Sequence, residues 1–211
     1  MKSERLITDQ EYVRVIYDQF NQSKTLIFFT KLFCYLVLPF IFPLILVSKT
    51  SDYLFRTVSE LLSITPFLFG TIIREAFYKR TLKSCGDNVS IGFGSVFLYR
   101  DISIGDNVLI GLYCTVHHCD IGSDVLISSG CRFLSGSKQH EFKRTDIPMI
   151  RQNGWMRKIK IGNDVWIGAN AVIMEDIEDG SVIGSGSVVN KRVEKYSIVA
   201  GNPVKVIRKR K

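Results

Sequence analysis

The stretch IGNDVWIGANAVIM, residues 161–174, decides how this chain folds. It is built of six-residue units that open with Ile-Gly and carry a small or β-branched residue at the fifth place. Such a unit is too short for a helix, and its β-branched content suits a short strand. The stretch therefore predicts a fold in which one short strand-and-turn element is repeated many times.

Four further segments show the same pattern: CGDNVSIGFGSV (85–96), IGDNVLIGLYCT (104–115), IGSDVLISSGCR (121–132) and IEDGSVIGSGSV (177–188). With the segment at 161 included, the starts are separated by 19, 17, 40 and 16 residues. Apart from the separation of 40, the period is near three units. Such a period predicts a solenoid whose stacked coils bury a continuous core. Ile at the first place is expected to point inward, and Gly at the second to permit the adjacent turn.

Charge and cysteine content narrow the possible partners. The net charge of +8 fits ligands with phosphates or an anionic membrane surface. No aromatic–basic motif for nucleic acid is present, so no nucleic-acid partner is expected. The five cysteines are odd in number and form no CxxC pair, which favours reduced thiols. Cys114 and Cys131 occupy fifth places of the repeat and are expected to be packing residues.

Composition divides the chain into a polar segment (1–25), a helical, membrane-associating region (26–83) and the repeat domain (84–211) with a loop at 135–158. Residues 26–47 read LIFFTKLFCYLVLPFIFPLILV, with Lys31 as their one charge. As a helix this run would be about 33 Å long, enough for one bilayer core. Pro39 and Pro43 leave open a kinked span, a re-entrant hairpin or a buried helix.

The residues between this run and the repeats are basic overall. After Pro66, apolar residues followed by basic ones indicate a helix that lies on a membrane or caps the next domain. The positive charge after residue 48 predicts that the repeat domain is cytoplasmic. A chain that starts near Lys83 is expected to keep its solenoid.

The repeats resemble the hexapeptide-repeat acyltransferases, most specifically in IGNDVWIGANAVIMEDIEDGSVIGSGSVVNKRVEKYSIVAGNPVKVIRKR (161–210). Within that family, the chain is similar to the galactoside, maltose and xenobiotic O-acetyltransferases and their polysaccharide-modifying relatives. The resemblance implies a mainly β fold, a left-handed parallel β-helix, and it alone supplies the hand of the coil. It also implies transfer of an acetyl group from acetyl-CoA to a sugar hydroxyl, without a metal, by a homotrimer with sites between subunits.

The separation of 40 residues holds one coil and an excursion of about twenty residues, which a solenoid must carry as a loop at one corner. This loop, SGSKQHEFKRTDIPMIRQNGW (135–155), contains His140, whose imidazole can take and return a proton near neutral pH. Related transferases carry their catalytic histidine in a corresponding loop, so the resemblance implies that His140 is the general base. Relatives often have Asp three residues later, where this chain has Lys143. The group that orients His140 therefore stays open.

The resemblance further implies a CoA site at positions that match the family. Trp166 would line the thioester end, the main chain at Gly168 and Ala169 would stabilise the oxyanion, and the remaining contacts would come from Ser185, Asn190, Lys191, Lys205 and Arg208. The last three would lie near the nucleotide phosphates. Residues 191–211 hold eight Lys or Arg against one acid, which fits phosphate binding, a solvated tail or contact with anionic lipid.

The acceptor side is less determined. Tyr113, His117, His118 and Trp155 are candidate sugar contacts, and each also fits an ordinary exposed side chain. The expected acceptor is a cell-surface glycan or a lipid-linked glycan precursor, acetylated at the cytoplasmic face of the bacterial inner membrane. Which hydroxyl reacts, and whether the acyl group is larger than acetyl, stays open.

Two other classes of function fit parts of the sequence. The three histidines and the stretch HHCDIG (117–122) resemble a γ-class carbonic anhydrase, a β-helix with zinc on three histidines. Adjacent side chains such as His117 and His118 diverge, however, which weakens a shared metal site. A non-catalytic solenoid that scaffolds a membrane complex is the other alternative, and it would need neither His140 nor the basic C-terminal constellation.

Overall fold

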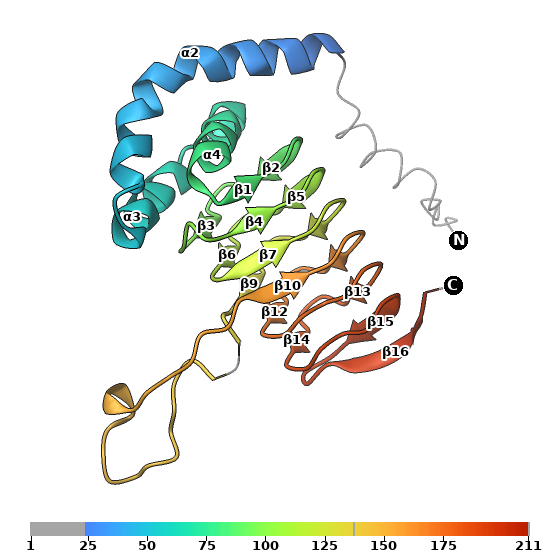
Figure 1. The fold of residues 1–211 in the computed structure, drawn as a ribbon. Coiled ribbons are helices and arrows are strands. Elements are labelled where there is room, and N and C mark those ends of the chain that lie inside the picture. Colours follow the sequence, from blue (N-terminus) through green and yellow to red (C-terminus); the bar gives the residue numbers. More distant parts are fainter. Residues whose placement is uncertain (1–23, 137, 211) are drawn as a thin grey trace, which may run out of the picture.

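The computed structural model describes residues 24–136 and 138–210 as a stack of coils with a helical cap at one end (Figure 1). Almost all of the expected polar segment 1–25 lies outside these residues. The cap consists of α2 (Lys24–Ser48), α3 (Asp52–Ser63) and α4 (Phe67–Thr81). Within the described ranges, no helix is both long enough and apolar enough to cross a membrane.

The coils present three faces of short strands. Face A contains β1 (Ser84–Cys85), β4 (Ser103–Ile104), β7 (Cys119–Ile121) and β10 (Ile159–Ile161). Face B contains β2 (Val89–Ile91), β5 (Val108–Ile110), β8 (Leu126–Ile127), β11 (Trp166–Ile167), β13 (Val182–Ile183), β15 (Ser197–Ala200) and β16 (Lys205–Lys209). Face C contains β3 (Val96–Phe97), β6 (Thr115–Val116), β9 (Arg132–Phe133), β12 (Val172–Ile173) and β14 (Val188–Val189). Neighbours are parallel except β16, which is antiparallel to β15, so the predicted parallel β solenoid is confirmed.

The inward ladder follows the repeat. Ile at the first place stacks in register on the same place of the next coil through Ile91, Ile110, Ile127, Ile167 and Ile183, all of them buried. The expectation for the first place is therefore confirmed. Cys114 and Cys131 are also fully buried, as expected of packing residues.

The reason expected for the second-place glycine is wrong. A Cβ on Gly105 would lie 2.7 Å from the carbonyl carbon of Gly122 in the next coil, so glycine is needed for close stacking of coils. The left-handed turn conformation falls two residues later, at Asn107 and, in the next coil, at Asp124, with φ of 57° and 60°. Asn and Asp tolerate this region better than other residues with a Cβ.

The cap closes the open end of the coil stack. The Tyr78 ring lies 4.6 Å from the Phe97 ring, and its hydroxyl shares a 2.6 Å hydrogen bond with Ser59. The Phe97 N–H donates to the same Ser59 hydroxyl at 3.1 Å. One continuous hydrophobic core runs from Val37 in α2 to Val204 near the C-terminus. The boundary expected at residue 83 therefore does not separate two cores.

Arg74 ties the cap to the first coil. Its side chain is buried, and its Nε donates to the Ile91 carbonyl at 2.9 Å. Its Nη1 donates to the carbonyls of Leu62 and Thr65, at 3.2 and 2.9 Å, where α3 ends. A cation is favourable at the C-terminal end of a helix, so the α3 carbonyls help to compensate the buried charge.

Candidate active site

Two of the three corners of each coil carry the candidate site residues. The corner between faces C and A, here the arm corner, comprises residues 98–102, 117–118, 134–158, 174–176 and 190–192. The corner between faces B and C, here the glycine corner, comprises residues 92–95, 111–114, 128–131, 168–171 and 184–187. Face C lies between them.

The 135–158 loop leaves the arm corner as an arm that projects away from the coils (Figure 1). Its two antiparallel segments, here called the strands of the arm, are not regular β-strands. Its stem is paired through main-chain hydrogen bonds from Arg157 to Ser135, from Trp155 to Lys138 and from Glu141 to Asn153, at 2.9, 2.8 and 2.7 Å. A Cβ on Gly154 would lie 1.8 Å from the Gln139 carbonyl oxygen, so this approach of the two strands requires glycine. His140 lies on the stem and is exposed to solvent.

Ion pairs fasten the returning strand of the arm to coils on both sides. Arg157 contacts Glu175 at 2.6 Å and Asp176 at 3.0 Å in the following coil. Lys158 contacts Asp101 at 2.9 Å, and it also contacts Asp120 at 3.3 Å. Exposed pairs each contribute little to stability, but these two adjacent cations fix where the arm leaves the body.

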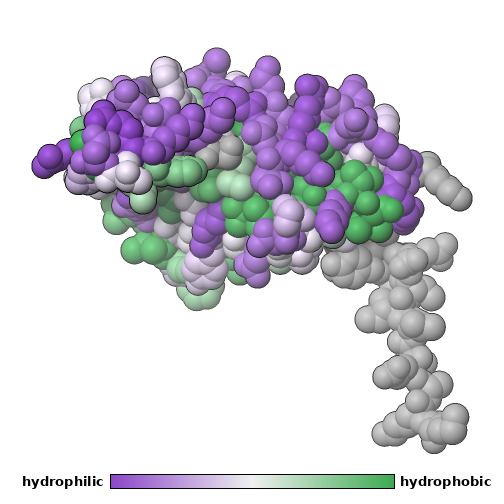
Figure 2. All heavy atoms as spheres, turned by 90° about the horizontal axis from the view of Figure 1, so that it is seen from below, coloured by the Kyte–Doolittle hydropathy of each residue, from purple (hydrophilic) through white to green (hydrophobic). Residues whose placement is uncertain are grey.

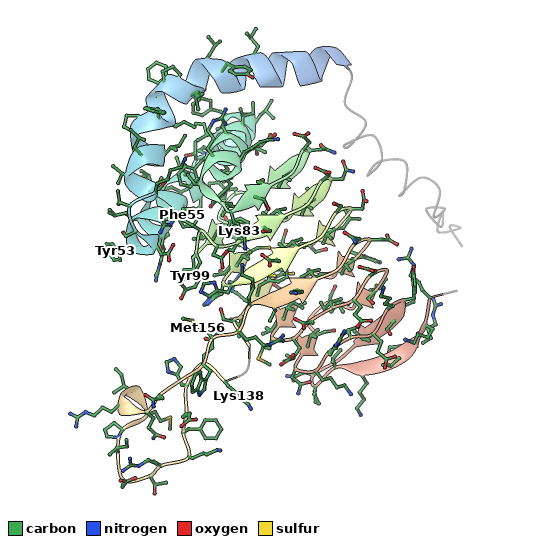
Figure 3. All side chains as sticks on the ribbon, in the orientation of Figure 1. Tyr53, Phe55, Lys83, Tyr99, Lys138 and Met156 are labelled. Atoms are coloured by element: carbon green, nitrogen blue, oxygen red, sulfur yellow. The ribbon has the colours of Figure 1, made fainter. Side chains whose placement is uncertain are left out.

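An aromatic stack lies beneath the arm. The rings of Tyr99 and His118 are parallel within 17° and 3.8 Å apart. The Tyr99 hydroxyl contacts the Met156 sulfur at 3.5 Å, and the main-chain N–H of His118 donates to the Ser135 hydroxyl at 3.2 Å. Figure 3 labels Tyr99 and Met156 between the cap and the arm. The stack and the stem thus form one continuous surface at the arm corner.

Both histidines beneath the arm favour the neutral form. Desolvation by burial lowers the pKa of His117, and the nearby His118 and Arg56 lower it further. Desolvation also lowers the pKa of His118, although Asp101 opposes that shift. A neutral imidazole can accept a hydrogen bond as well as donate one.

The expected CoA residues form two adjacent rows, one on face B and one along the glycine corner. Trp166 pairs in register with Val182, Val182 with Ile198, and Ile198 with Arg208, so the four side chains lie on one outward side. With about 4.8 Å between strands, Trp166 and Arg208 are about 14 Å apart. Trp166 is half exposed.

The second row contains the glycine-corner residues. A Cβ on Gly168 would lie 2.5 Å from the Ser185 nitrogen, and the Gly186 N–H donates to the Ala169 carbonyl at 2.8 Å. Lys205 faces Ala200 on β15 at the end of this row. The structure therefore brings together six of the eight expected CoA residues.

The remaining candidates are divided between the two corners. Asn190 and Lys191 lie at the arm corner, away from the Trp166 row. Tyr113 lies at the glycine corner, and β6 separates it from His117 and His118 at the arm corner. Trp155 is exposed on the arm, on the strand opposite His140.

Sequence reasoning missed three residues of this region. Tyr99 precedes His118 by 19 residues, which is a repeat spacing, so the period itself could have placed the two rings in neighbouring coils. Lys158, at the base of the arm, gave no such signal. Arg132 is exposed on face C, and its Nη1 donates to the Tyr113 carbonyl, which marks the face between the two corners.

The histidines do not form a metal centre. In the described part of the chain, no group of three or more His, Cys, Asp or Glu side chains is placed to hold a metal ion. The carbonic anhydrase-like alternative gains no support from this geometry.

Comparison with known proteins agrees with the repeat. A family model described as bacterial transferase hexapeptide (six repeats) matches residues 158–191, and one described as hexapeptide repeat of succinyl-transferase matches residues 101–131. The galactoside O-acetyltransferase of Escherichia coli K12 is 33% identical over 144 residues, which cover 64% of this chain and 68% of that protein. The chain belongs to the hexapeptide-repeat acyltransferase family.

Other members of the family are similar over shorter stretches. A chloramphenicol acetyltransferase of Agrobacterium fabrum is 42% identical over 106 residues, 43% of this chain and 51% of that protein. The match covers half to two thirds of several such relatives. Among solved structures, galactoside acetyltransferase in complex with coenzyme A superimposes with a TM-score of 0.65 at 26% identity, covering 75% of this chain and 80% of the other.

Proposed function

We propose that this protein transfers an acetyl group from acetyl-CoA to a hydroxyl of a sugar. The observation that carries the proposal is the in-register row from Trp166 to Arg208, flanked by the row from Gly168 to Lys205. It combines an exposed indole, closely stacked glycine backbone and two exposed cations on one outer surface. A relative of this family has been solved with coenzyme A bound, which supports the same donor here.

The two rows suit the parts of an extended acyl-CoA. The thioester would lie at Trp166 and the nucleotide phosphates at Lys205 and Arg208, because cations pair with phosphate and an indole packs on apolar chain. The separation of about 14 Å between Trp166 and Arg208 leaves room for an extended pantetheine arm.

The chemistry requires one base and one oxyanion contact. His140 takes the proton of the acceptor hydroxyl while the oxygen attacks the thioester carbonyl. A main-chain N–H near Gly168 and Ala169 stabilises the oxyanion of the tetrahedral intermediate. As that intermediate collapses, the C–S bond breaks and the CoA sulfur receives the proton from the imidazolium. The products are the acetyl ester and free CoA.

A single chain does not complete this site, which supports a homotrimer. His140 leaves from the arm corner, whereas Gly168 and Ala169 lie at the glycine corner across face C. The arm also carries exposed apolar side chains, among them Phe142, Ile150 and Trp155, and Ile150 is 90% exposed. A neighbouring subunit that covers this arm would bring its own Trp166 row toward His140.

The acceptor is proposed to bind beside the arm. The Tyr99–His118 stack offers a flat surface for a sugar ring, and His117, Trp155 and the neighbouring subunit's glycine corner, with its copy of Tyr113, are further contacts. We propose a cell-surface glycan or its lipid-linked precursor as the acceptor, because these flat rings and polar side chains suit a sugar. The putative lipopolysaccharide biosynthesis O-acetyl transferase WbbJ of Escherichia coli K12, 29% identical over 128 residues, supports this acceptor class.

The test is acetyl transfer by the purified full chain. With acetyl-CoA and a galactoside, we expect release of free CoA thiol and a product heavier by one acetyl group. His140→Ala should lower turnover by about 10² or more while acetyl-CoA affinity stays unchanged. Glu141→Gln, the next residue on the same stem, is the matched control and should retain activity. Failure of the chain to bind acetyl-CoA in calorimetry would overturn the proposal and favour a scaffold.

A further inference from the structure

Between Tyr35 and Val47, the outward side of α2 is as apolar as its buried side. α2 directs Val37, Ile41 and Ile45 into the core, at the four-residue spacing of one helix face. The exposed large residues next to them along the helix are also apolar: Leu36, Phe40, Phe42, Leu46 and Val47, here called the cap surface. A helix at the surface of a water-soluble domain would carry polar side chains there.

Apolar exposure is not confined to α2. Tyr53 and Leu61 of α3 and Phe67 and Leu68 of α4 are also exposed, and Phe67 is 88% exposed. Figure 3 labels Tyr53 at the outer edge of the cap and Phe55 on its inner side. Each exposed apolar side chain costs free energy in water. We therefore expect lipid or another protein surface to bury this end of the molecule.

The opposite end of the molecule differs. Figure 2 looks at the molecule from below, toward the C-terminal coils and the arm, and this side is mainly hydrophilic, with smaller apolar patches. A molecule that is apolar at one end and polar at the other suits a boundary between an apolar and an aqueous phase.

The shape and the sequence of the cap favour lipid over a second copy as the cover. α2 arches over α4, with Pro39 and Pro43 inside it, so its outward side is convex (Figure 1). Two convex surfaces of identical chains would meet over a small area, whereas lipid adapts to a convex surface. Residues 26–47 carry one charge in 22 residues, and the whole chain has a net charge of +8, which favours anionic lipid.

The helices also favour lying on a bilayer over crossing it. The inward side of α2 is already occupied by its contacts with α3 and α4, which leaves one side for lipid. A helix so placed buries only its outer side among the lipid headgroups and upper acyl chains.

We propose that the cap surface is a membrane-binding surface that lies in the interfacial layer of an anionic bilayer, with the coils projecting into the aqueous phase. The basic residues after Ser48 favour the cytoplasmic leaflet of the bacterial inner membrane, because its lipids are anionic. This placement does not depend on the acetyl transfer proposed above.

The test is flotation of the full chain with lipid vesicles after removal of a mild detergent by dilution. Vesicles of phosphatidylcholine and phosphatidylglycerol should carry the protein upward in a density gradient, and pure phosphatidylcholine should carry less. Leu36→Ser with Phe40→Ser should lower the partition coefficient by about tenfold or more, because two apolar side chains no longer enter lipid. The matched control is Val206→Ser with Ile207→Ser, which removes two similarly exposed side chains from β16, and it should float like the unaltered chain.

Circular dichroism checks that each variant is folded, and Phe42→Ser with Leu46→Ser tests the same surface with a second pair. The proposal is overturned if both cap variants float like the unaltered chain, or if the unaltered chain does not float with anionic vesicles. Light scattering tests whether a second copy of the chain, instead of lipid, buries the cap surface. The membrane proposal is wrong if the unaltered chain, without lipid, forms an assembly larger than the proposed trimer that the cap variants do not form. In that case a second copy occupies the cap surface.

Discussion

At the scale of single residues, buried polar groups decide how the helices and the coils fit together. Arg74 donates to carbonyls of the α3 end and of β2, and Ser59 links Tyr78 to the main chain of Phe97. Burial raises the pKa of Tyr78 to about 12, so its hydroxyl remains protonated and able to donate at any physiological pH. These bonds align α3 and α4 on the first coil, where hydrophobic contact alone would allow sliding.

We predict that Arg74→Met destabilises the protein by about 3 kcal/mol or more, because several buried carbonyls lose their donor. Urea denaturation followed by circular dichroism measures the free energy of unfolding. Arg56→Met is the matched control, since Arg56 is exposed and forms a surface ion pair with Glu60, and we expect it to cost about 1 kcal/mol or less. Equal losses in the two variants would show that the buried network contributes nothing special.

At the scale of elements, the arm interrupts the repeat and carries the candidate base, His140. Its stem is held by main-chain pairing, by the close approach at Gly154 and by the ion pairs of Arg157 and Lys158. These contacts place His140 a few residues from the body instead of at the free tip of the arm. The position of the base therefore depends on the stem more than on the residues at the tip.

We predict that Gly154→Ala separates the two strands of the stem and displaces His140. Turnover should fall by about tenfold to a hundredfold, because proton transfer requires close positioning. Limited trypsin digestion should also cleave the arm faster at Lys143, Arg144 or Arg151, a readout that does not depend on activity. Asn153→Ala keeps the main-chain pairing and serves as the control. An arm that stays resistant to trypsin in Gly154→Ala would contradict this account of the stem.

At the scale of the whole molecule, the cap and the coils share one core. Tyr78 packs on Phe97, and the buried residues form a single cluster from α2 to the last coil. The expectation that a chain starting near Lys83 keeps its solenoid therefore needs revision. The first coil would lose the side chains that cover Phe97 and the hydroxyl that binds its N–H.

We predict that residues 83–211 expressed alone aggregate or unfold at a lower temperature than the full chain. A chain that starts at Ser51 removes α2 but keeps α3 and α4 on the first coil, and it should retain the β-type circular dichroism spectrum. Soluble yield and thermal midpoint compare the three proteins. A stable, soluble 83–211 fragment with the midpoint of the full chain would show that the cap is dispensable for folding.

The parallel β solenoid, the coil boundaries and the departure of residues 135–158 as a corner loop could be predicted from the sequence alone. The underlying pattern repeats every few residues, so the residues of each unit indicate where its turn falls and which side chain points inward. The buried ladder of Ile residues and the packed Cys114 and Cys131 follow directly from that local pattern. The family resemblance then predicted that His140 is the general base and that Trp166 lines the thioester end of the CoA site.

Only the tertiary structure decided which distant residues share a surface. Arg208 joins the Trp166 row because β16 turns back antiparallel on β15, an irregular step that no repeat encodes. Tyr113 and His118 are close in sequence but lie at different corners, whereas Tyr99 and His118 are separated by 19 residues and stack. The contacts of Arg74 and the position of the cap surface likewise depend on how α3 and α4 pack on the first coil and how α2 packs on α3 and α4. Periodic signals are local and can be read along the chain, but corners, caps and returning strands are settled by contacts between residues far apart in sequence.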